Sequence, residues 1–150
     1  MLILDTTVLI AALDKARVSH QKARDLLSSD VAKSLTTQTM RESLAVATRP
    51  ISANGLGLDI SIAWRSITAM RMACDRLLYE NEKWWASYNA LMLDLQPGGR
   101  SIYDLGQVAH VHSLGKPARL LTDDDGIFAR YKGRIDVVTL SAYRFPNTTS

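Results

Sequence analysis

The chain has 150 residues, a formal net charge of +3 at pH 7 and 47% hydrophobic residues. This length and composition are typical of one globular domain with an ordinary core, so we expect a single domain over residues 1–150. The single cysteine excludes an intrachain disulfide, and no apolar run approaches the roughly 18 residues needed to cross a membrane. The N-terminus lacks a basic leader, which argues against a signal peptide and favours a cytoplasmic protein.

Short apolar segments alternate along the chain with segments of helical periodicity. Four stretches are predicted as buried strands, namely residues 2–5, 33–37, 118–122 and 136–140. The predicted helices between them cover residues 8–14, 20–29, 39–49, 58–79, 84–95 and 105–115, with a short helical turn at 127–131. Short strands separated by helices predict an α/β fold in which a mostly parallel sheet carries helices on both faces.

Residues that favour helix ends mark several of these boundaries. Thr7, Ser19 and Thr39 are predicted to begin the first three helices, and Gly115 is predicted to end the helix over 105–115. The helix over 58–79 is expected to bury one stripe of side chains spaced three and four apart. This stripe consists of Ile60, Ala63, Ile67, Met70, Cys74 and Leu77.

Acidic residues follow two of the predicted strands. Asp5 ends the first strand, and a triplet of acids at 123–125 follows the strand over 118–122. Each has a local explanation, because aspartate is common in turns and at helix N-termini. Burying a lone carboxylate is costly, however, so an acid at the end of a buried strand is also a candidate for a functional site.

Two further acids lie near predicted helix starts. Glu42 lies three residues after Thr39, which is the spacing of a capping box, and Asp104 lies three residues before Gln107. Helix capping is therefore the alternative explanation for both. A shared site is favoured because all four acidic positions are expected at the same edge of a parallel sheet, where ligands bind in such folds.

Carboxylates gathered at one edge repel one another and raise one another's pKa values. A divalent cation relieves this repulsion, and oxygen ligands favour Mg²⁺ or Mn²⁺ over zinc. The three histidines have no zinc-type spacing with Cys74. If four of the 15 acids occupy one cleft, the 18 basic and 11 remaining acidic residues leave +7 elsewhere, which suits a polyanionic substrate.

Four stretches, in this order and spacing, resemble the PIN domain and more narrowly the VapC-like toxins of type II toxin–antitoxin pairs. They are D-T-T-V-L from Asp5, T-x-x-E-S-L-A-V from Thr39, G-R-S-I-Y-D ending at Asp104, and L-L-T-D-D-D-G-I-F from Leu120. The resemblance extends from Met1 to about Leu140. It implies a PIN-like three-layer sandwich.

The resemblance also carries the family's four acidic site residues onto this chain. They fall on Asp5, Glu42, Asp104 and Asp124, with Asp123 as the alternative for the fourth. It implies that Asp5, Asp104 and Asp124 bind Mg²⁺ or Mn²⁺, and that Glu42 orients the attacking water. Thr7, where the family usually has Ser or Asn, and Thr122 are expected to support the carboxylates.

The implied activity is metal-dependent cleavage of RNA that leaves a 5′-phosphate and a 3′-hydroxyl. Arg49 and Arg100 are candidates to bind the RNA backbone, with solvated surface charge as the alternative. The implied partners are a small antitoxin that covers the acidic cleft and a second copy of the chain in a homodimer. Some large apolar residues of the central helices are expected at such surfaces and most in the core; they are Met70, Met72, Trp84 and Trp85.

Other interpretations predict different behaviour. A haloacid-dehalogenase-like phosphatase needs an acid where Thr7 stands, and a receiver domain needs one after the strand over 33–37, so the sequence disfavours both. Two alternatives stay open: a PIN nuclease that processes RNA without being a toxin, and a catalytically inert PIN-like binding module. The complete set of acids argues against the inert module.

Overall fold

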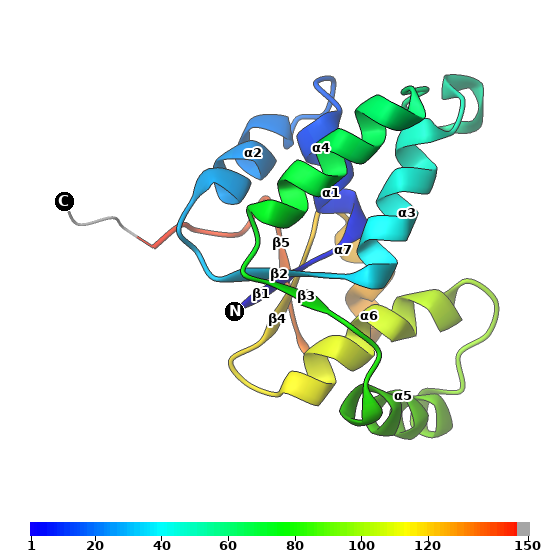
Figure 1. Ribbon diagram of the computed structural model, residues 1–150. Helices are drawn as coiled ribbons and strands as arrows, with labels where there is room; N and C mark the ends of the chain where they lie inside the picture. The colour runs from blue at the N-terminus through cyan, green and yellow to red at the C-terminus, as the bar shows by residue number, and fades with distance from the viewer. Residues whose placement is uncertain (147–150) are drawn as a thin grey trace.

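Parallel strands form the centre of the protein, whose computed structural model describes residues 1–146 (Figure 1). The strands in the described chain are β1 (Leu2–Leu4), β2 (Lys33–Thr36), β3 (Arg76–Leu78), β4 (Arg119–Thr122) and β5 (Asp136–Thr139). They lie in the order β3-β2-β1-β4-β5, and every pairing between neighbours is parallel. The predicted α/β fold is therefore confirmed. The last four residues of the domain predicted over 1–150 lie outside the described residues.

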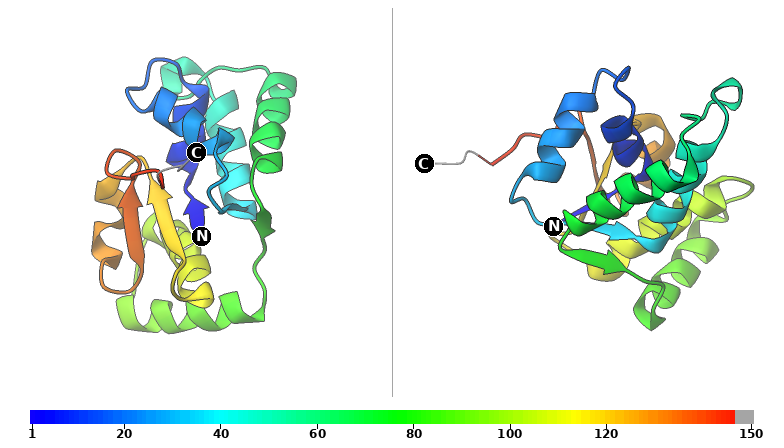
Figure 2. Two further views of the ribbon diagram at one scale, coloured as in Figure 1. Left: turned by 90° about the vertical axis from the view of Figure 1, so that its left-hand side faces the viewer. Right: turned by 45° about the horizontal axis from the view of Figure 1, so that its top comes forward.

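Helices cover both faces of this sheet, as the two views in Figure 2 show. The α-helices are α1 (Thr6–Leu13), α2 (His20–Ser28), α3 (Thr37–Thr48), α4 (Ile60–Met72), α5 (Glu82–Leu95), α6 (Ser101–Leu114) and α7 (Asp125–Phe128). Two short 3₁₀ helices are η1 (Ile51–Ala53) and η2 (Ala129–Tyr131). Figure 1 shows α1 to α4 on one side of the sheet and α5 and α6 on the other. No helix of the described chain is long and apolar enough to cross a membrane.

The side chains of the central strands alternate between two cores. Leu2 and Leu4 of β1 pack with residues of α1 and α2, whereas Ile3 packs with residues of α5 and α6. In β4, Leu121 joins the first core and Leu120 the second. Successive residues of a strand point to opposite faces, so strands that are apolar on both faces need helices on both sides. The three-layer sandwich is confirmed.

The helix predicted over residues 58–79 is wrong in its second half. α4 ends at Met72, and β3 follows as an edge strand paired with β2. Met70 of α4, Cys74 and Leu77 all pack against the core that holds α1 and α2. The apolar spacing of α4 therefore continues past the end of the helix. An apolar spacing of three and four therefore does not distinguish one long helix from a helix and a strand that cover the same core. Ile60 also differs from the prediction, since its side chain is 58% exposed.

The first and third helices begin earlier than predicted because other residues cap them. The carboxylate of Asp5, and not Thr7, caps α1 by accepting from the backbone N–H of Thr7. Thr36 caps α3, where its hydroxyl oxygen accepts from the backbone N–H of Thr39 at 2.9 Å. The capping box between Thr39 and Glu42, which was the alternative explanation for Glu42, does not form.

Two other predicted helix starts also differ in detail. α6 begins at Ser101, so Asp104 lies in its first turn and is not its cap. Ser19 stands at the N-cap position of α2, but its side chain makes no capping hydrogen bond. Its hydroxyl donates instead to Asp123, in the turn after β4. Gly115 ends α6 as predicted, with a φ of 64° that suits glycine.

Candidate active site

The candidate site lies at the carboxyl edge of the sheet, where β1 and β4 run side by side. The strand order reverses between these two strands, and ligands of open α/β sheets bind at such a switch point. Asp5 follows β1 and Thr122 ends β4. The Thr122 hydroxyl donates to Oδ2 of Asp5 at 3.0 Å, so the two strand ends meet.

Asp5 is 5% exposed, and its Oδ2 atom accepts hydrogen bonds from Thr7 and from Thr122. The Thr7 hydroxyl donates to it at 2.6 Å and the Thr7 backbone N–H at 3.3 Å, in addition to Thr122. Burial raises the pKa of Asp5 above the ordinary value of 3.8, and these hydrogen bonds lower it by less. Asp5 therefore caps α1 and also places a carboxylate in the interior whose negative charge the protein only partly offsets.

Glu42 lies in the first half of α3, and two side chains fix its carboxylate. The Thr6 hydroxyl donates to Oε2 at 2.8 Å, and Nε2 of Gln38 donates to Oε1 at 2.7 Å. Thr6 and Thr7 are neighbours in the first turn of α1. Adjacent hydroxyls of one helix turn thus bind two acids that are 37 positions apart in the sequence.

Asp104 is half-buried in the first turn of α6. Burial raises its pKa above the ordinary 3.8, and the negative charges of Asp5 and Glu42 raise it further. Arg130 and Arg100 act in the opposite direction. Acids from three distant segments of the chain therefore form one electrostatic group. Their negative charges repel one another, as expected from the sequence.

The donor set of this group fits a hard divalent cation. Its atoms are carboxylate oxygens, which suit Mg²⁺ or Mn²⁺, and the carboxylates of Asp5 and Asp104 lack a full complement of positive charge. Within residues 1–146, no three His, Cys, Asp or Glu side chains stand close enough together to form a ready-made metal site. Metal binding to these three acids therefore requires their side chains to move closer together or to share water.

Asp124, the predicted fourth acid, caps the short helix α7. Its Oδ1 atom accepts from the backbone N–H of Gly126 at 2.9 Å, and the side chain is exposed. The described contacts of this carboxylate do not include Asp5, Glu42 or Asp104. The helix-capping explanation therefore accounts for its observed position.

Asp123, the alternative fourth acid, faces the loop between α1 and α2. Its Oδ2 atom accepts from the Ser19 hydroxyl at 2.6 Å and lies 3.6 Å from Nη1 of Arg17. Its backbone is linked to Asp5 through Thr7, because its N–H donates to the Thr7 hydroxyl at 2.9 Å and that hydroxyl donates to Asp5. The turn is thus joined to Asp5 through hydroxyl groups, while the carboxylates of Asp123 and Asp124 are bound elsewhere.

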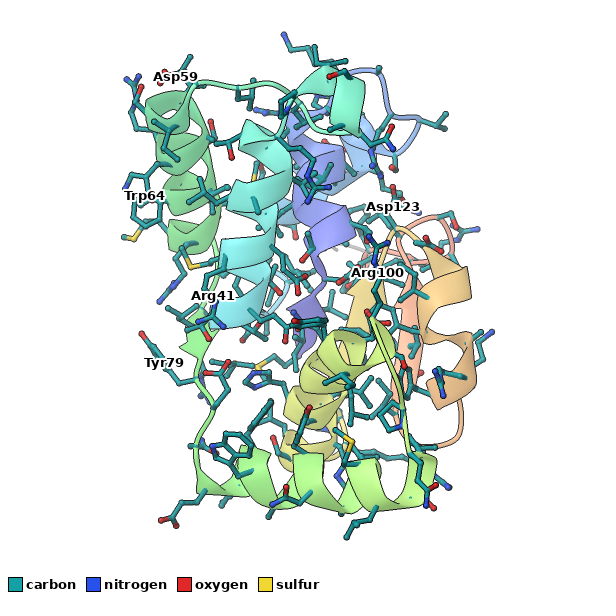
Figure 3. All side chains as sticks on the ribbon, turned by 90° about the vertical axis from the view of Figure 1, so that its right-hand side faces the viewer. Arg41, Asp59, Trp64, Tyr79, Arg100 and Asp123 are labelled. Atoms are coloured by element: carbon teal, nitrogen blue, oxygen red, sulfur yellow. The ribbon has the colours of Figure 1, made fainter. Side chains whose placement is uncertain are left out.

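The two predicted RNA-binding arginines lie in different places. Arg100 directly precedes α6 and its charge lowers the pKa of Asp104, so it lies near the acids. Figure 3 shows Arg100 on the side of the molecule between α3 and α7. Arg49 follows α3, seven residues beyond Glu42, which corresponds to about 10 Å along a helix axis. Arg130, which was not predicted from the sequence, also lies near Asp104.

A buried polar network beneath the acids was not predicted from the sequence. Gln107 of α6 is 1% exposed, and its Nε2 atom donates to the hydroxyls of Thr36 at 3.1 Å and Thr39 at 2.8 Å. The Thr39 hydroxyl donates to the carbonyl of Leu4 at 3.1 Å. This network ties the ends of β1 and β2 to α3 and α6. The signal for it was a glutamine inside an otherwise apolar helical stretch.

The fold and the three acids define a class of protein. The PIN domain family model matches residues 2–134. This match covers most of the chain, so the chain belongs to the PIN domain family.

Solved structures with the same fold include VapC toxins. VapBC2 from Rickettsia felis, bound to a DNA fragment from its promoter, has a TM-score of 0.69 at 15% identity, covering 92% of this chain and 97% of that chain. A toxin–antitoxin complex from Klebsiella pneumoniae has a TM-score of 0.62 at 18% identity, covering 97% of this chain and 100% of that chain. VapC20 from Mycobacterium tuberculosis, a sarcin–ricin loop cleaving toxin, has a TM-score of 0.63 at 13% identity, covering 87% of this chain and 95% of that chain. At these identities the likeness shows the fold. No curated protein sequence matches the chain.

Proposed function

We propose that the protein is a Mg²⁺- or Mn²⁺-dependent endoribonuclease and the toxin of a toxin–antitoxin pair. The observation that supports this most strongly is the electrostatic group at the switch point. Asp5, Glu42 and Asp104 come from three segments; burial raises the pKa of Asp104, and the negative charges of Asp5 and Glu42 raise it further. A fold needs no such repulsion for its own stability, whereas a divalent cation held by these carboxylates, directly or through water, would relieve it.

The proposal gives each side chain a role in phosphodiester hydrolysis. A bound Mg²⁺ or Mn²⁺ lowers the pKa of a water molecule and polarises the phosphodiester. Asp5 and Asp104 would hold the cation, and Glu42 would orient the attacking water and accept its proton. Thr7 and Thr122 keep the Asp5 carboxylate in position through its Oδ2 atom. Asp124 would complete the site from the periphery through water, since its Oδ1 atom already caps α7.

RNA as the substrate is supported by charge. The acids lie in a chain with a net charge of +3, and Arg100 and Arg130 act on Asp104. Cations beside a carboxylate cluster can bind the phosphates that flank the scissile bond. The fold also matches that of VapC20, a sarcin–ricin loop cleaving toxin. We therefore also propose a cytoplasmic location, where such an RNA substrate would be found.

Exposed apolar side chains support the proposed protein partners. Ile60, Trp64 and Met72 recur at multiples of four along α4, and they are 58%, 53% and 77% exposed. On α5, Trp84 is buried, whereas Trp85 is 52% exposed. We assign these surfaces to a small antitoxin and to a second copy of the chain. Light scattering after size exclusion would give the mass of a dimer, and a monomer at all concentrations would contradict it.

The decisive experiment measures RNA cleavage in the presence of Mg²⁺ or Mn²⁺ and compares wild type with Asp104→Asn. The substitution removes one negative charge from the group while keeping the shape of the side chain. We expect cleavage to require the added metal and to fall on the order of 10³-fold in the variant, as for the loss of several kcal/mol of metal-dependent stabilisation.

Asp59→Asn is the matched control. Asp59 caps α4 at the end of the molecule away from Arg100 (Figure 3), and its replacement should leave cleavage unchanged. Cleavage by Asp104→Asn at the wild-type rate would contradict the proposed site. Release of phosphate from a small monoester would favour a phosphatase, and partner binding without any cleavage would favour the inert module.

A further inference from the structure

Gln38 connects the acid on α3 with the helix that carries Asp104. Its Nε2 atom donates to Oε1 of Glu42 at 2.7 Å and to the carbonyl of Tyr103 at 2.8 Å. Both partners can only accept, so both hydrogens of the side-chain NH₂ group are used and the orientation of the amide is fixed. Tyr103 directly precedes Asp104 in the first turn of α6.

Gly106 provides the space that this side chain occupies. A Cβ atom built at position 106 would lie 2.5 Å from Oε1 of Gln38, which is closer than real Cβ contacts allow. The next contacts, with Cδ of Gln38 at 3.5 Å and with Cζ2 of Trp84 at 3.8 Å, are ordinary. Glycine in a helix interior is unfavourable relative to alanine, so a close approach explains its presence here. The missing side chain at Gly106 therefore leaves room for the amide of Gln38 against the backbone of α6.

We propose that Gln38 is a positioning residue, which holds the Glu42 carboxylate in a fixed relation to Asp104, and that Gly106 is the glycine that permits it. Without Gln38, only Thr6 would restrain Glu42, and the carboxylate could rotate about that single hydrogen bond. The proposal rests on the proposed nuclease function, because it assigns the orientation of the acid that would handle the attacking water.

The first test replaces Gln38 by alanine. A hydrogen bond to a charged group that is lost from a transition state lowers the rate, so we expect single-turnover cleavage to fall roughly tenfold or more. RNA affinity, measured in Ca²⁺ to prevent turnover, should stay at the wild-type value because Gln38 contacts an acid and not the substrate. An unchanged rate, or an equal loss of affinity, would overturn the proposal.

The chain contains a closely matched control for this substitution. Gln21 of α2 donates from Nε2 to Oδ1 of Asp25 at 2.8 Å, which is the same pairing of a glutamine with an acid four residues later. This pair lies outside the acidic group, so Gln21→Ala should leave both rate and RNA affinity unchanged. A loss equal to that of Gln38→Ala would show a general helix effect and overturn the assignment.

The second test uses Gly106→Ala, which should separate activity from stability. Thermal stability should stay equal or rise because alanine is the better helix former, whereas the cleavage rate should fall as in Gln38→Ala. If the new methyl group acts by displacing Gln38, the double variant Gln38→Ala/Gly106→Ala should be no slower than Gln38→Ala alone. Additive losses, or a normal rate in Gly106→Ala, would overturn the coupling.

Mn²⁺ binding distinguishes failure of this inference from failure of the proposed function. If the wild-type chain does not cleave RNA with Mg²⁺ or Mn²⁺, the nuclease proposal is overturned, and the inference is decided by calorimetric titration with Mn²⁺. Weaker Mn²⁺ binding in Gln38→Ala and Gly106→Ala than in wild type and Gln21→Ala would support the positioning role. Equal behaviour of all four proteins would overturn it.

Discussion

Two groups of acids stand at the carboxyl edge of the sheet, and their carboxylates behave differently. On the β1 side, Asp5 accepts from threonine hydroxyls while burial raises its pKa, and it contributes to the raised pKa of Asp104. On the β4 side, Asp124 caps α7 and Asp123 binds Ser19 and Arg17. The protein compensates the negative charge of the first group only in part, whereas contacts that serve the fold account for the positions of the second.

This difference shows that position at a strand end does not by itself make an acid part of a site. Asp5 and Asp124 both follow a strand and both cap a helix through the N–H two residues later. What separates them is burial, since Asp5 is buried and Asp124 is exposed. Desolvation makes the negative charge of Asp5 costly and therefore makes a cation favourable beside it.

The largest expected effect compares substitutions in the two groups. Asp5→Asn keeps the cap of α1 but removes the buried charge, so RNA cleavage should fall on the order of 10³-fold while the fold persists. Asp124→Asn should cost about tenfold, as for a residue that acts on a metal site through water. Cleavage assays and circular dichroism on both variants measure this. Equal losses would erase the distinction between the two groups.

Added metal should stabilise the protein through the β1 group. A ligand at 100 times its Kd stabilises by about 2.7 kcal/mol, which corresponds to a rise in Tm of about 5 °C or more for a chain of this size. Differential scanning fluorimetry with and without Mg²⁺ should show this rise in wild type and in Asp123→Asn. It should be absent in Asp5→Asn, and a rise that persists there would place the cation elsewhere.

The two arginines should differ in their contribution to RNA binding. Arg100→Ala should weaken RNA binding several-fold and reduce the slope of log K against log salt by about 1, as for one lost phosphate contact. Arg49→Ala should change both quantities less, because Arg49 lies at the far end of α3 from Glu42. Fluorescence anisotropy across a salt series measures both. A larger effect at Arg49 would move the RNA path toward that end of the helix.

The smallest effect concerns pH in the absence of metal. The pKa of Asp104 in the folded protein is raised above the ordinary 3.8, so the folded state holds its proton to higher pH than the unfolded chain does. The free energy of unfolding should therefore fall as pH rises from 3.8 to the raised value, and become level above it. Urea unfolding of wild type and Asp104→Asn should differ most above this window, with wild type the less stable.

Much of the fold followed from the sequence because β1, β2, β4 and β5 are short strand-like runs between helical segments. β3 was missed because Leu77 packs against the same core as α4 and continues its spacing. The sequence pattern shows only which residues face the core. A short strand at the sheet edge can place apolar side chains on that core as well as another turn of helix can. The parallel order of the sheet was then enough to place Asp5, Glu42 and Asp104 together.

The details of the site depended on side-chain geometry that local patterns do not contain. Glu42 fits a capping box with Thr39, yet Thr36 caps α3 and leaves Glu42 free to bind Thr6. The role of Gln38 depends on a glycine 68 positions later, which no local pattern connects with it. The spacing of four between Gln38 and Glu42 was the available signal, because such residues are neighbours on a helix.

The hydroxyl group of Thr122 has one hydrogen and three acceptors within reach. Oδ2 of Asp5 lies 3.0 Å away, and the carbonyl oxygen of Asp124 and the hydroxyl oxygen of Thr7 each lie 3.1 Å away. An ionised Asp5 attracts this hydrogen, whereas a carboxylate whose charge is taken up by a proton or a cation competes for it less. Neutralisation of Asp5 would therefore favour donation from Thr122 to the carbonyl oxygen of Asp124, in the turn after β4. Rotation of one hydroxyl group would thus couple the charge of Asp5 to the backbone hydrogen bonding of that turn.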